Sequence, residues 1–265
     1  MHPMLNIAVR AARAAGNVIT RGYENRDDLD IQSKGAQDFV TKIDKEAEQT
    51  IISKIQQSFP DHSFIGEEGG NVKGNDDFTW IIDPLDGTSN FIAGIPHFAV
   101  SIALLFKGKL DQAVVFDPIR GELFAATKGS GAQLNGYRLR CTKAKDLSNT
   151  ILATAIPFRN KANLKADIAQ FANVFKDAGD VRRTGSAALD LAYVAAGRFD
   201  GYFEKGLKSW DIAAGELLVK ESGGLVTDYA GNNDPLYDEI KLAGSANGLV
   251  AGNPRVVQNI VKRLK

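Results

Sequence analysis

The chain has 265 residues, enough for one broad domain or two packed subdomains. Lys plus Arg and Asp plus Glu each number 32, which excludes a global electrostatic attraction to nucleic acid or to an anionic membrane. The single Cys141 excludes an internal disulfide, and no stretch approaches the roughly 18 apolar residues of a membrane-spanning helix. We therefore expect a soluble cytoplasmic protein. With only three histidines, a histidine-rich metal site is hard to assemble, whereas oxygen ligands are plentiful.

Two helices are predicted at the start of the chain. Apolar residues recur at helical spacing from Leu5 to Tyr23. A second helix begins where Thr41-x-x-Asp44 matches a capping box, and it ends before Pro60. Asp44 then has a structural interpretation as a first-turn carboxylate that the helix dipole favours.

A largely antiparallel sheet follows these helices. Its expected strands are short apolar or alternating segments, with Asn135-Gly136 as a hairpin turn. These strands are 63–65, 80–82, 98–104, 113–116 and 123–126. The pattern predicts a meander across the first half of the chain.

From about Asn149, strands and helices alternate. The expected strands are 151–156, 181–183, 201–204, 225–227 and 249–251, and the expected helices are 164–178, 186–197, 212–221 and one after Asn253-Pro254. A subdomain boundary near 143–149 would give an N-terminal part, 1–145, with most metal ligands and a C-terminal α/β part, 146–265, that completes the site.

Acidic residues stand at the ends of two neighbouring predicted strands. Asp83 and Asp86 follow a buried strand. Pro84 fixes its own φ angle, and Gly87 permits a backbone turn that a side chain would obstruct. Glu67 ends the preceding strand, so the three carboxylates could converge on a hard divalent cation. The alternatives are that Asp-Pro and Asp-Gly are ordinary turn formers, and that the adjacent Glu68 is a solvated loop acid.

Three later segments also have two interpretations each. Thr184 to Ala188 joins a strand to a helix and could hold an anion, or Ser186 could simply cap the helix. Asp211 could be an N-cap, although burial beside Trp210 would call for a partner such as a metal. Glu204 ends a strand and could meet either a polar ligand or solvent.

These motifs together resemble the inositol monophosphatase family, and closely its bacterial inositol-1-monophosphatase branch. The resemblance spans nearly the whole chain, and the residues that carry it are Gly66-Glu67-Glu68, Trp80 to Phe91, Gly185 to Ala188 and Trp210 to Gly215. It implies an α/β fold, the layered α-β-α-β-α sandwich of the inositol monophosphatase / fructose-1,6-bisphosphatase superfamily, and a homodimer.

The resemblance also implies roles for individual residues. The residues implied to bind Mg²⁺ are Glu67, Asp83, the Leu85 carbonyl, Asp86 and Asp211. The residues implied to have catalytic roles are Asp44, Glu67 and Thr88. Substrate contacts are implied for Asp86, Gly87, Thr88, Gly185, Ser186, Ala187, Glu204 and Asp211. Lys34 and Asp38 would lie on a mobile loop over the site, whereas the acidic segment Asn232 to Asp238 has no counterpart and is interpreted as surface variation.

The implied activity is Mg²⁺-dependent hydrolysis of inositol monophosphates to myo-inositol and phosphate. A phosphate monoester needs concentrated positive charge, and an all-oxygen site suits Mg²⁺ better than zinc. Direct attack by a metal-activated water, assisted by Thr88 and Asp44, fits the lack of a histidine-centred constellation. Inhibition by lithium is a further expectation from the family.

Other functions remain open from the sequence. Related phosphatases act on 3′-phosphoadenosine 5′-phosphate, fructose 1,6-bisphosphate, histidinol phosphate or NADP. The bacterial branch is also associated with ribosomal RNA transcription antitermination through Nus factors and RNA polymerase, a non-catalytic role in partner binding. Basic residues that could serve it are Arg138, Arg140, Lys143, Lys145, Arg182 and Arg183, although such clusters more often form a solvated surface.

Overall fold

The computed structural model describes residues 2–25, 31–35, 38–69, 71–156, 162–233 and 248–265. The backbone of Lys34 and Asp38 lies in two short strands, but their side chains are outside the described part, and so is the segment Asn232 to Asp238 from residue 234 onward. The predictions for these side chains and for that segment therefore remain predictions.

The first half consists of helices followed by a meander, as predicted. In chain order, its elements are α1 (Pro3–Glu24), β1 (Ile31–Gly35), β2 (Asp38–Thr41), α2 (Lys42–Gln56), β3 (His62–Gly66), β4 (Asn75–Asp86), α3 (Thr88–Ala93), β5 (Ala99–Phe106), β6 (Lys109–Asp117), β7 (Glu122–Thr127), β8 (Gly131–Leu134) and β9 (Tyr137–Arg138). The short helix α3 and the early start of β4 were not predicted from the sequence.

The second half alternates strands and helices. Its elements are β10 (Ile151–Ala155), α4 (Leu164–Phe175), β11 (Asp180–Arg182), α5 (Ala187–Ala195), β12 (Gly201–Glu204), α6 (Ser209–Glu221), β13 (Leu225–Asp228), β14 (Leu249–Gly252) and α8 (Pro254–Leu264). The predicted cap of the last helix is confirmed, since the Asn253 side chain accepts hydrogen bonds from the Arg255 and Val256 amides.

The larger sheet has the strand order β3-β4-β5-β6-β7-β8-β9, with β3 and β4 parallel and the other neighbours antiparallel. In β5 the predicted alternation of large apolar residues is present, yet the intervening residues Ala99, Ser101 and Ala103 are buried too. Burial on both faces means that helices cover the sheet on each side.

The smaller sheet has the order β11-β10-β12-β14-β13 and mixed strand directions. Strand β10 is parallel to β11 and β12, while β14 runs antiparallel to both β12 and β13. The alternating sequence pattern predicted the strands and helices but not this reversal.

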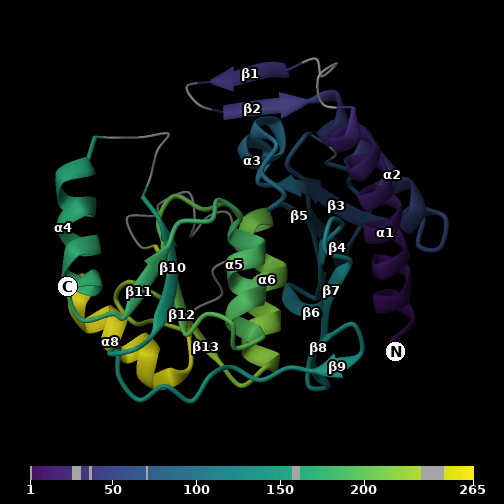
Figure 1. Ribbon diagram of the computed structural model, residues 1–265. Helices are drawn as coiled ribbons and strands as arrows, with labels where there is room; N and C mark the ends of the chain where they lie inside the picture. The colour runs from purple at the N-terminus through teal and green to yellow at the C-terminus, as the bar shows by residue number, and fades with distance from the viewer. Residues whose placement is uncertain (1, 26–30, 36–37, 70, 157–161, 234–247) are drawn as a thin grey trace.

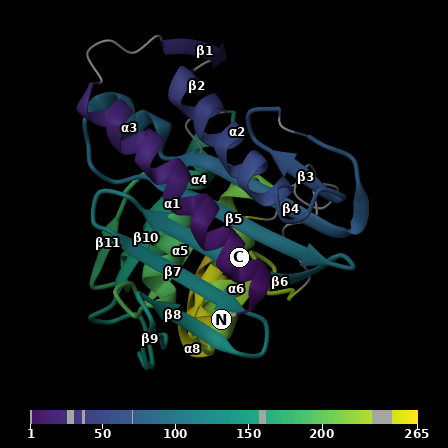
Figure 2. The ribbon, with the colours of Figure 1, turned by 90° about the vertical axis from the view of Figure 1, so that its right-hand side faces the viewer.

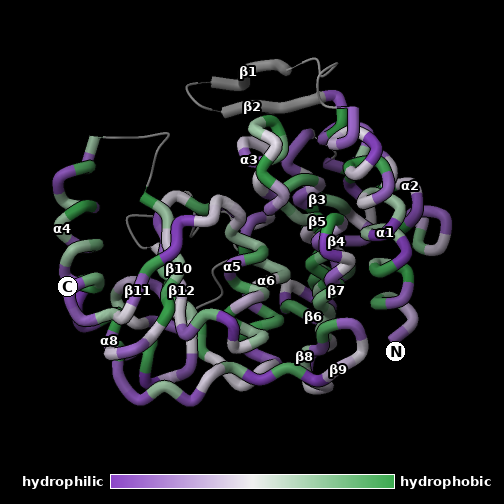
Figure 3. The backbone as a smooth tube through the Cα atoms, viewed as in Figure 1, coloured by the Kyte–Doolittle hydropathy of each residue, from purple (hydrophilic) through white to green (hydrophobic). Residues whose placement is uncertain are grey.

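Figure 1 shows five layers, which confirms the predicted α-β-α-β-α sandwich. Helices α1 and α2 cover the outer face of the large sheet, α5 and α6 lie between the sheets, and α4 and α8 cover the outer face of the small sheet. From the side, α1 crosses in front of the central strands of the large sheet (Figure 2). The outer helices α1 and α4 alternate hydrophobic and hydrophilic residues (Figure 3), as expected for helices with one solvated side.

A single buried cluster contains residues of the large sheet, of the central helices and of the small sheet, for example Val115, Leu217 and Tyr202. The division into 1–145 and 146–265 thus remains a prediction about chain organisation. Among the described helices, none is long and apolar enough to cross a membrane.

His62 at the start of β3 makes stability depend on pH. Its ring stacks between Phe59 and Phe78, at centroid distances of 4.7 and 4.6 Å, and its Nδ1 accepts a 3.0 Å hydrogen bond from Trp80 Nε1. Burial lowers the pKa of His62, against a smaller opposite effect of Asp61. The fold therefore favours neutral His62, and this contribution is complete above the ordinary pKa and is lost as pH falls through the lowered one.

We expect thermal scans to show a fall in Tm as the pH is lowered below about 6.5, and this fall should be smaller in His62→Asn, whose amide oxygen can accept from Trp80 without titrating. The exposed His2→Asn is the matched control. Equal pH dependence in wild type and His62→Asn would contradict the assignment.

Candidate active site

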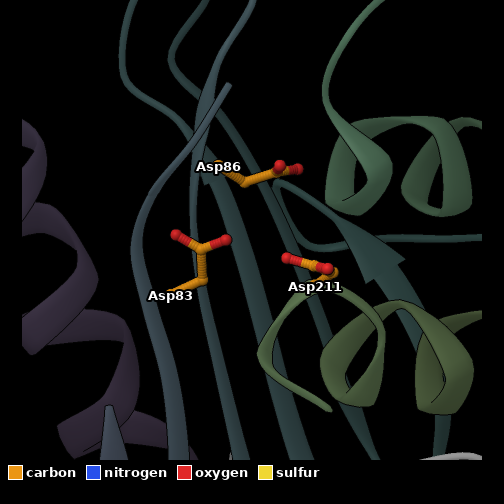
Figure 4. A group of neighbouring side chains, drawn as sticks. All are labelled: Asp83, Asp86 and Asp211. Atoms are coloured by element: carbon orange, nitrogen blue, oxygen red, sulfur yellow. The ribbon is translucent and has the colours of Figure 1, made fainter. Parts of the chain in front are cut away.

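Three carboxylates converge at the edge of the large sheet that faces α6. One oxygen from each of Asp83, Asp86 and Asp211 lies within 4.8 Å of the others. Asp83 and Asp86 come from the end of β4, and Asp211 comes from the first turn of α6, as Figure 4 shows. Asp211 lies 125 positions after Asp86 in the sequence, yet the fold brings it into one group with Asp83 and Asp86. Carboxylate oxygens are the ligands that a hard divalent cation prefers.

The end of β4 is irregular, and this irregularity presents both of its carboxylates. The register with β5 shifts between Asp83 and Asp86, and the Asp83 carboxylate accepts a 3.0 Å hydrogen bond from the Leu85 amide. The sequence predicted a strand over 80–82, whereas β4 continues through Asp83 and Pro84 to Asp86. The local bulge explains how two residues three apart reach the same point.

Glu67 reaches the site because β3 is parallel to β4. The strand β3 ends at Gly66, which pairs with Ile82, and the Glu67 amide donates to the Ile82 carbonyl over 3.2 Å. Glu67 lines the cavity beside Asp83, although it is not one of the three residues whose oxygens lie within 4.8 Å of each other. The sequence predicted that neighbouring strands bring Glu67 to the same edge as Asp83 and Asp86. The parallel pairing of β3 with β4 places Glu67 there.

The Asp86 carboxylate is held by the start of α5. Its Oδ2 accepts hydrogen bonds from Ser186 Oγ at 2.6 Å and from the Ala188 amide at 2.7 Å. Ser186 also caps α5, with its Oγ accepting from the Leu189 amide. The capping interpretation is therefore confirmed. Ser186 also lines the cavity, and its contact with an anion or a substrate stays a prediction.

Thr88 and Asp44 form a pair beside the converging carboxylates. Thr88 Oγ1 lies 3.1 Å from Asp44 Oδ1 and 3.0 Å from the Leu85 carbonyl. Asp44 is in the first turn of α2 and only 1% exposed, and it is not among the residues that line the cavity. Asp44 is connected to the cavity wall by its contact with Thr88, which lines the cavity.

The interpretation of Asp211 as an N-cap residue is wrong. Helix α6 begins at Ser209, so Asp211 is its third residue, and Asp211 Oδ2 accepts a 2.6 Å hydrogen bond from the Lys208 amide. This hydrogen bond holds the Asp211 carboxylate through one of its two oxygens. Ser101 Oγ of β5 donates a 3.2 Å hydrogen bond to the Trp210 carbonyl and so connects the same turn of α6 to β5.

The electrostatics of the cluster favour a bound cation. Burial, followed by the charges of Glu67, Asp86 and Asp211, raises the pKa of Asp83 well above its ordinary value. Burial likewise raises the pKa of Asp86 to about 7, although Ser186 and Ala188 oppose this shift. Packed acids of one sign are costly when ionised, and a divalent cation would offset that cost. The donor set, carboxylates and a carbonyl, fits Mg²⁺.

A cavity of about 400 Å³ contains most of the predicted site. Its wall includes eleven of the predicted residues, namely Glu67, Asp83, Leu85, Asp86, Gly87, Thr88, Gly185, Ser186, Ala187, Glu204 and Asp211. Asp44 stands behind this wall. The same cavity is lined by Asn90, Arg183 and Asp190, which were not predicted as site residues.

Asn90 joins the two halves of the chain beside the cavity. Its Nδ2 donates to the His97 carbonyl at 2.8 Å and to the Thr184 carbonyl at 2.9 Å. The sequence places Asn90 in the same motif as Asp83, but nothing in its spacing shows which backbone carbonyls it would reach. Asp190 had a weak signal, because it is the only acid in the otherwise apolar helix Ala187–Ala195.

We expect Asn90→Ala to lower the free energy of unfolding by about 2 kcal/mol, since two backbone carbonyls lose their donor. Urea denaturation measures the change. Asn25→Ala is the control, because its amide bonds only to the exposed end of α1. A loss no larger in Asn90→Ala than in this control would contradict the bridging role.

The layered fold is that of the inositol monophosphatase / fructose-1,6-bisphosphatase class of α/β proteins. The chain belongs to the inositol monophosphatase family, whose sequence profile it matches over residues 1–264. It is 56% identical to the Nus factor SuhB of Escherichia coli strain K12 over 266 aligned residues, which cover 100% of this chain and 97% of that protein.

Solved structures agree with this assignment. The extragenic suppressor protein suhB from Bartonella henselae is 39% identical, with a TM-score of 0.93 over 100% of this chain and 99% of that one. The inositol monophosphatase from Anabaena (Nostoc) sp. PCC 7120 is 35% identical, with a TM-score of 0.83 over 98% and 94% of the two chains. The predicted family and fold are thereby confirmed.

Proposed function

We propose that this protein is a Mg²⁺-dependent phosphatase that hydrolyses inositol monophosphates to myo-inositol and phosphate. The observation that carries the proposal is the convergence of Asp83, Asp86 and Asp211 within 4.8 Å on the wall of a cavity large enough for a small phosphate ester. Family membership supports the phosphatase class, and the all-oxygen donor set supports the metal.

The residues that would hold Mg²⁺ are Glu67, Asp83, the Leu85 carbonyl, Asp86 and Asp211. When bound, Mg²⁺ supplies positive charge that neutralises the phosphate and favours ionisation of water and of the leaving alkoxide. The chain itself fixes these ligands before any ion arrives, because Asp86 and Asp211 each have one oxygen held by a backbone amide. Such preorganisation spares the cost of ordering them on binding.

Thr88 and Asp44 would orient the attacking water and take up its proton. The Thr88 hydroxyl can donate its one proton to Asp44 or to the Leu85 carbonyl, and because Thr88 lines the cavity its oxygen can accept a hydrogen bond from water there. Asp44, withdrawn from solvent, then serves as the proton acceptor through Thr88. The backbone amides of Gly87 and Thr88 would contact the phosphate, with Gly185, Ser186 and Ala187 beside it.

The test is phosphate release from D-myo-inositol 1-phosphate, with and without Mg²⁺, beside 3′-phosphoadenosine 5′-phosphate and fructose 1,6-bisphosphate. We expect Mg²⁺-dependent turnover with preference for the inositol ester, and inhibition by lithium. Preference for another ester would overturn the substrate and keep the phosphatase class. Absence of turnover with every ester would overturn the catalytic proposal.

A second function, partner binding in ribosomal RNA transcription antitermination, is favoured by the full-length identity of 56% to a protein named Nus factor SuhB. The partners would be RNA polymerase and Nus factors, met in the cytoplasm by a homodimer. A pull-down with purified Nus factors and RNA polymerase tests the binding, and light scattering tests the dimer. If the function is independent of catalysis, Asp86→Asn should bind as wild type does.

A further inference from the structure

Helix α2 carries two carboxylates on its buried side, one helical turn apart. Asp44 and Glu48 are four positions apart, and each is only 1% exposed. Asp44 contacts Thr88, which lines the cavity, whereas the mechanism proposed above does not use Glu48. The other buried residues of α2 are apolar, so a glutamate buried among them calls for an explanation.

Glu48 holds the chain segment that carries Glu67. Glu48 Oε2 accepts a 2.9 Å hydrogen bond from the amide of Glu68, the residue directly after Glu67. The residue directly before it, Gly66, lies against the same carboxylate, because a Cβ on Gly66 would stand 2.6 Å from Glu48 Cδ and closer still to Oε2. The Glu48 carboxylate is therefore packed against the backbone on both sides of Glu67.

The three consecutive amides around Glu67 each have an acceptor on a different part of the chain. The Gly66 amide donates to Asn71 Oδ1 over 3.2 Å, the Glu67 amide to the Ile82 carbonyl over 3.2 Å, and the Glu68 amide to Glu48. The first acceptor follows within the same loop, the second is on β4, and the third is on α2. The bond to α2 fixes the backbone just beyond Glu67, where β3 has already ended.

We propose that Glu48 is a positioning residue that holds the Glu67 carboxylate in place for metal binding. This role rests on the proposed Mg²⁺-dependent function, in which Glu67 is a ligand. Glu48 is not among the residues that line the cavity, so it acts through the backbone of Gly66 and Glu68 and touches neither the ion nor the substrate. Groups that orient metal ligands raise metal affinity without binding the metal themselves.

Glu221 offers a matched control for this role. It is the last residue of α6, at the opposite end of the helix from Asp211, and it does not line the cavity. Its two carboxylate oxygens accept hydrogen bonds of 2.7 and 2.8 Å from the amides of Gly129 and Gly131. Glu221 thus makes the same kind of contact, from a helix to the backbone of a turn, at a place unrelated to the metal ligands.

Glu48→Ala and Glu48→Gln test the proposal through the binding of Mg²⁺ alone. The rise in Tm of the metal-free protein with increasing Mg²⁺, measured by differential scanning calorimetry, gives an apparent Kd. We expect this Kd to rise about 10-fold or more in Glu48→Ala, because an orienting partner of a ligand is lost. Glu48→Gln keeps an oxygen that can accept from the Glu68 amide, so its Kd should rise less than about threefold.

The Mg²⁺ dependence separates positioning from a general loss of structure. In Glu48→Ala, phosphate-ester turnover should recover toward the wild-type kcat as Mg²⁺ is raised, whereas partial unfolding would lower kcat at every Mg²⁺ concentration. Glu221→Ala should lower Tm and leave the Kd for Mg²⁺ unchanged. A wild-type Kd in Glu48→Ala, or an equal rise in Glu221→Ala, would overturn the role of Glu48 alone. A wild-type Tm that did not respond to Mg²⁺ would overturn the proposed metal-dependent function as well, so the two failures are distinguishable.

Gly66→Ala provides a test that does not depend on the folding of Glu48→Ala. Gly66 is not one of the glycines with a positive φ, so alanine can adopt its backbone conformation, but the new Cβ would displace the Glu48 carboxylate. Gly66→Ala should therefore raise the Kd for Mg²⁺ about 10-fold, as Glu48→Ala does. In the Glu48→Ala background the same substitution should change the Kd less than about twofold, because the displaced group is absent. Additive effects of the two substitutions would overturn the proposal.

Discussion

Asp86→Asn is expected to reduce phosphatase kcat/KM at least about 1,000-fold while making the metal-free protein more stable at neutral pH. The loss of activity follows from removing one of the three converging carboxylates. The gain in stability follows from burial, which raises the pKa of Asp86 to about 7. Because asparagine keeps an oxygen for Ser186 and Ala188, the start of α5 should remain in place.

The destabilising effect of the buried Asp86 carboxylate depends on pH. Since the pKa of Asp86 in the fold, about 7, is above its ordinary value of 3.8, its contribution to stability is complete below 3.8 and is lost as pH rises through 7. The Tm advantage of Asp86→Asn over metal-free wild type should therefore grow from about pH 4 to 7 and then level off. Differential scanning calorimetry in chelator measures it, and we expect about 2 to 6 °C.

Asp77→Asn is the control for this experiment, because it removes a charge from the exposed start of the same strand. Added Mg²⁺ should raise the Tm of wild type and of Asp77→Asn but leave that of Asp86→Asn nearly unchanged. Wild-type turnover by Asp86→Asn would exclude it from the metal site. A Tm that falls in metal-free Asp86→Asn would show that the carboxylate is not a source of strain.

The sequence predicted best what depends on local pattern. Apolar periodicity predicted helices α1 and α2 and the strands of the meander, and Asn253-Pro254 predicted where α8 begins. The sequence predicted the structure less well where the backbone departs from regular strands and helices. The bulge that lets β4 run on to Asp86 and the start of α6 before Asp211 depend on tertiary contacts, including the bond from Ser101 to the Trp210 carbonyl.

The site was predictable to the extent that its residues stand in recognisable motifs. Asp83, Asp86 and Asp211 are such residues, and their convergence follows from the order of the layers. Asp190 and the bridging contacts of Asn90 were missed, because each depends on a partner about 6 or more residues away whose position only the fold sets. The carbonyl of Thr184, for example, is 94 positions from Asn90.

Gly87 is expected to be the least replaceable glycine of the site. Its φ is 98°, a conformation that side chains rarely adopt, and a Cβ there would lie 3.0 Å from the His97 carbonyl oxygen and 3.2 Å from Phe98 Cβ. We expect Gly87→Ala to lower the free energy of unfolding by about 3 kcal/mol, measured by urea denaturation. Turnover should fall at least about 100-fold, because Asp86 and Thr88 flank the residue.

Gly121→Ala separates the two causes of this loss. Gly121 also has a positive φ, 64°, but a Cβ there would meet nothing within 4 Å, and the residue lies in the turn between β6 and β7. Its substitution should cost only the conformational part, about 1 kcal/mol, and leave turnover unchanged. If Gly87→Ala were no more destabilised than Gly121→Ala and kept its turnover, the close approach of His97 would not constrain the site. A larger loss in Gly87→Ala alone would show that the metal ligands depend on backbone packing at this turn.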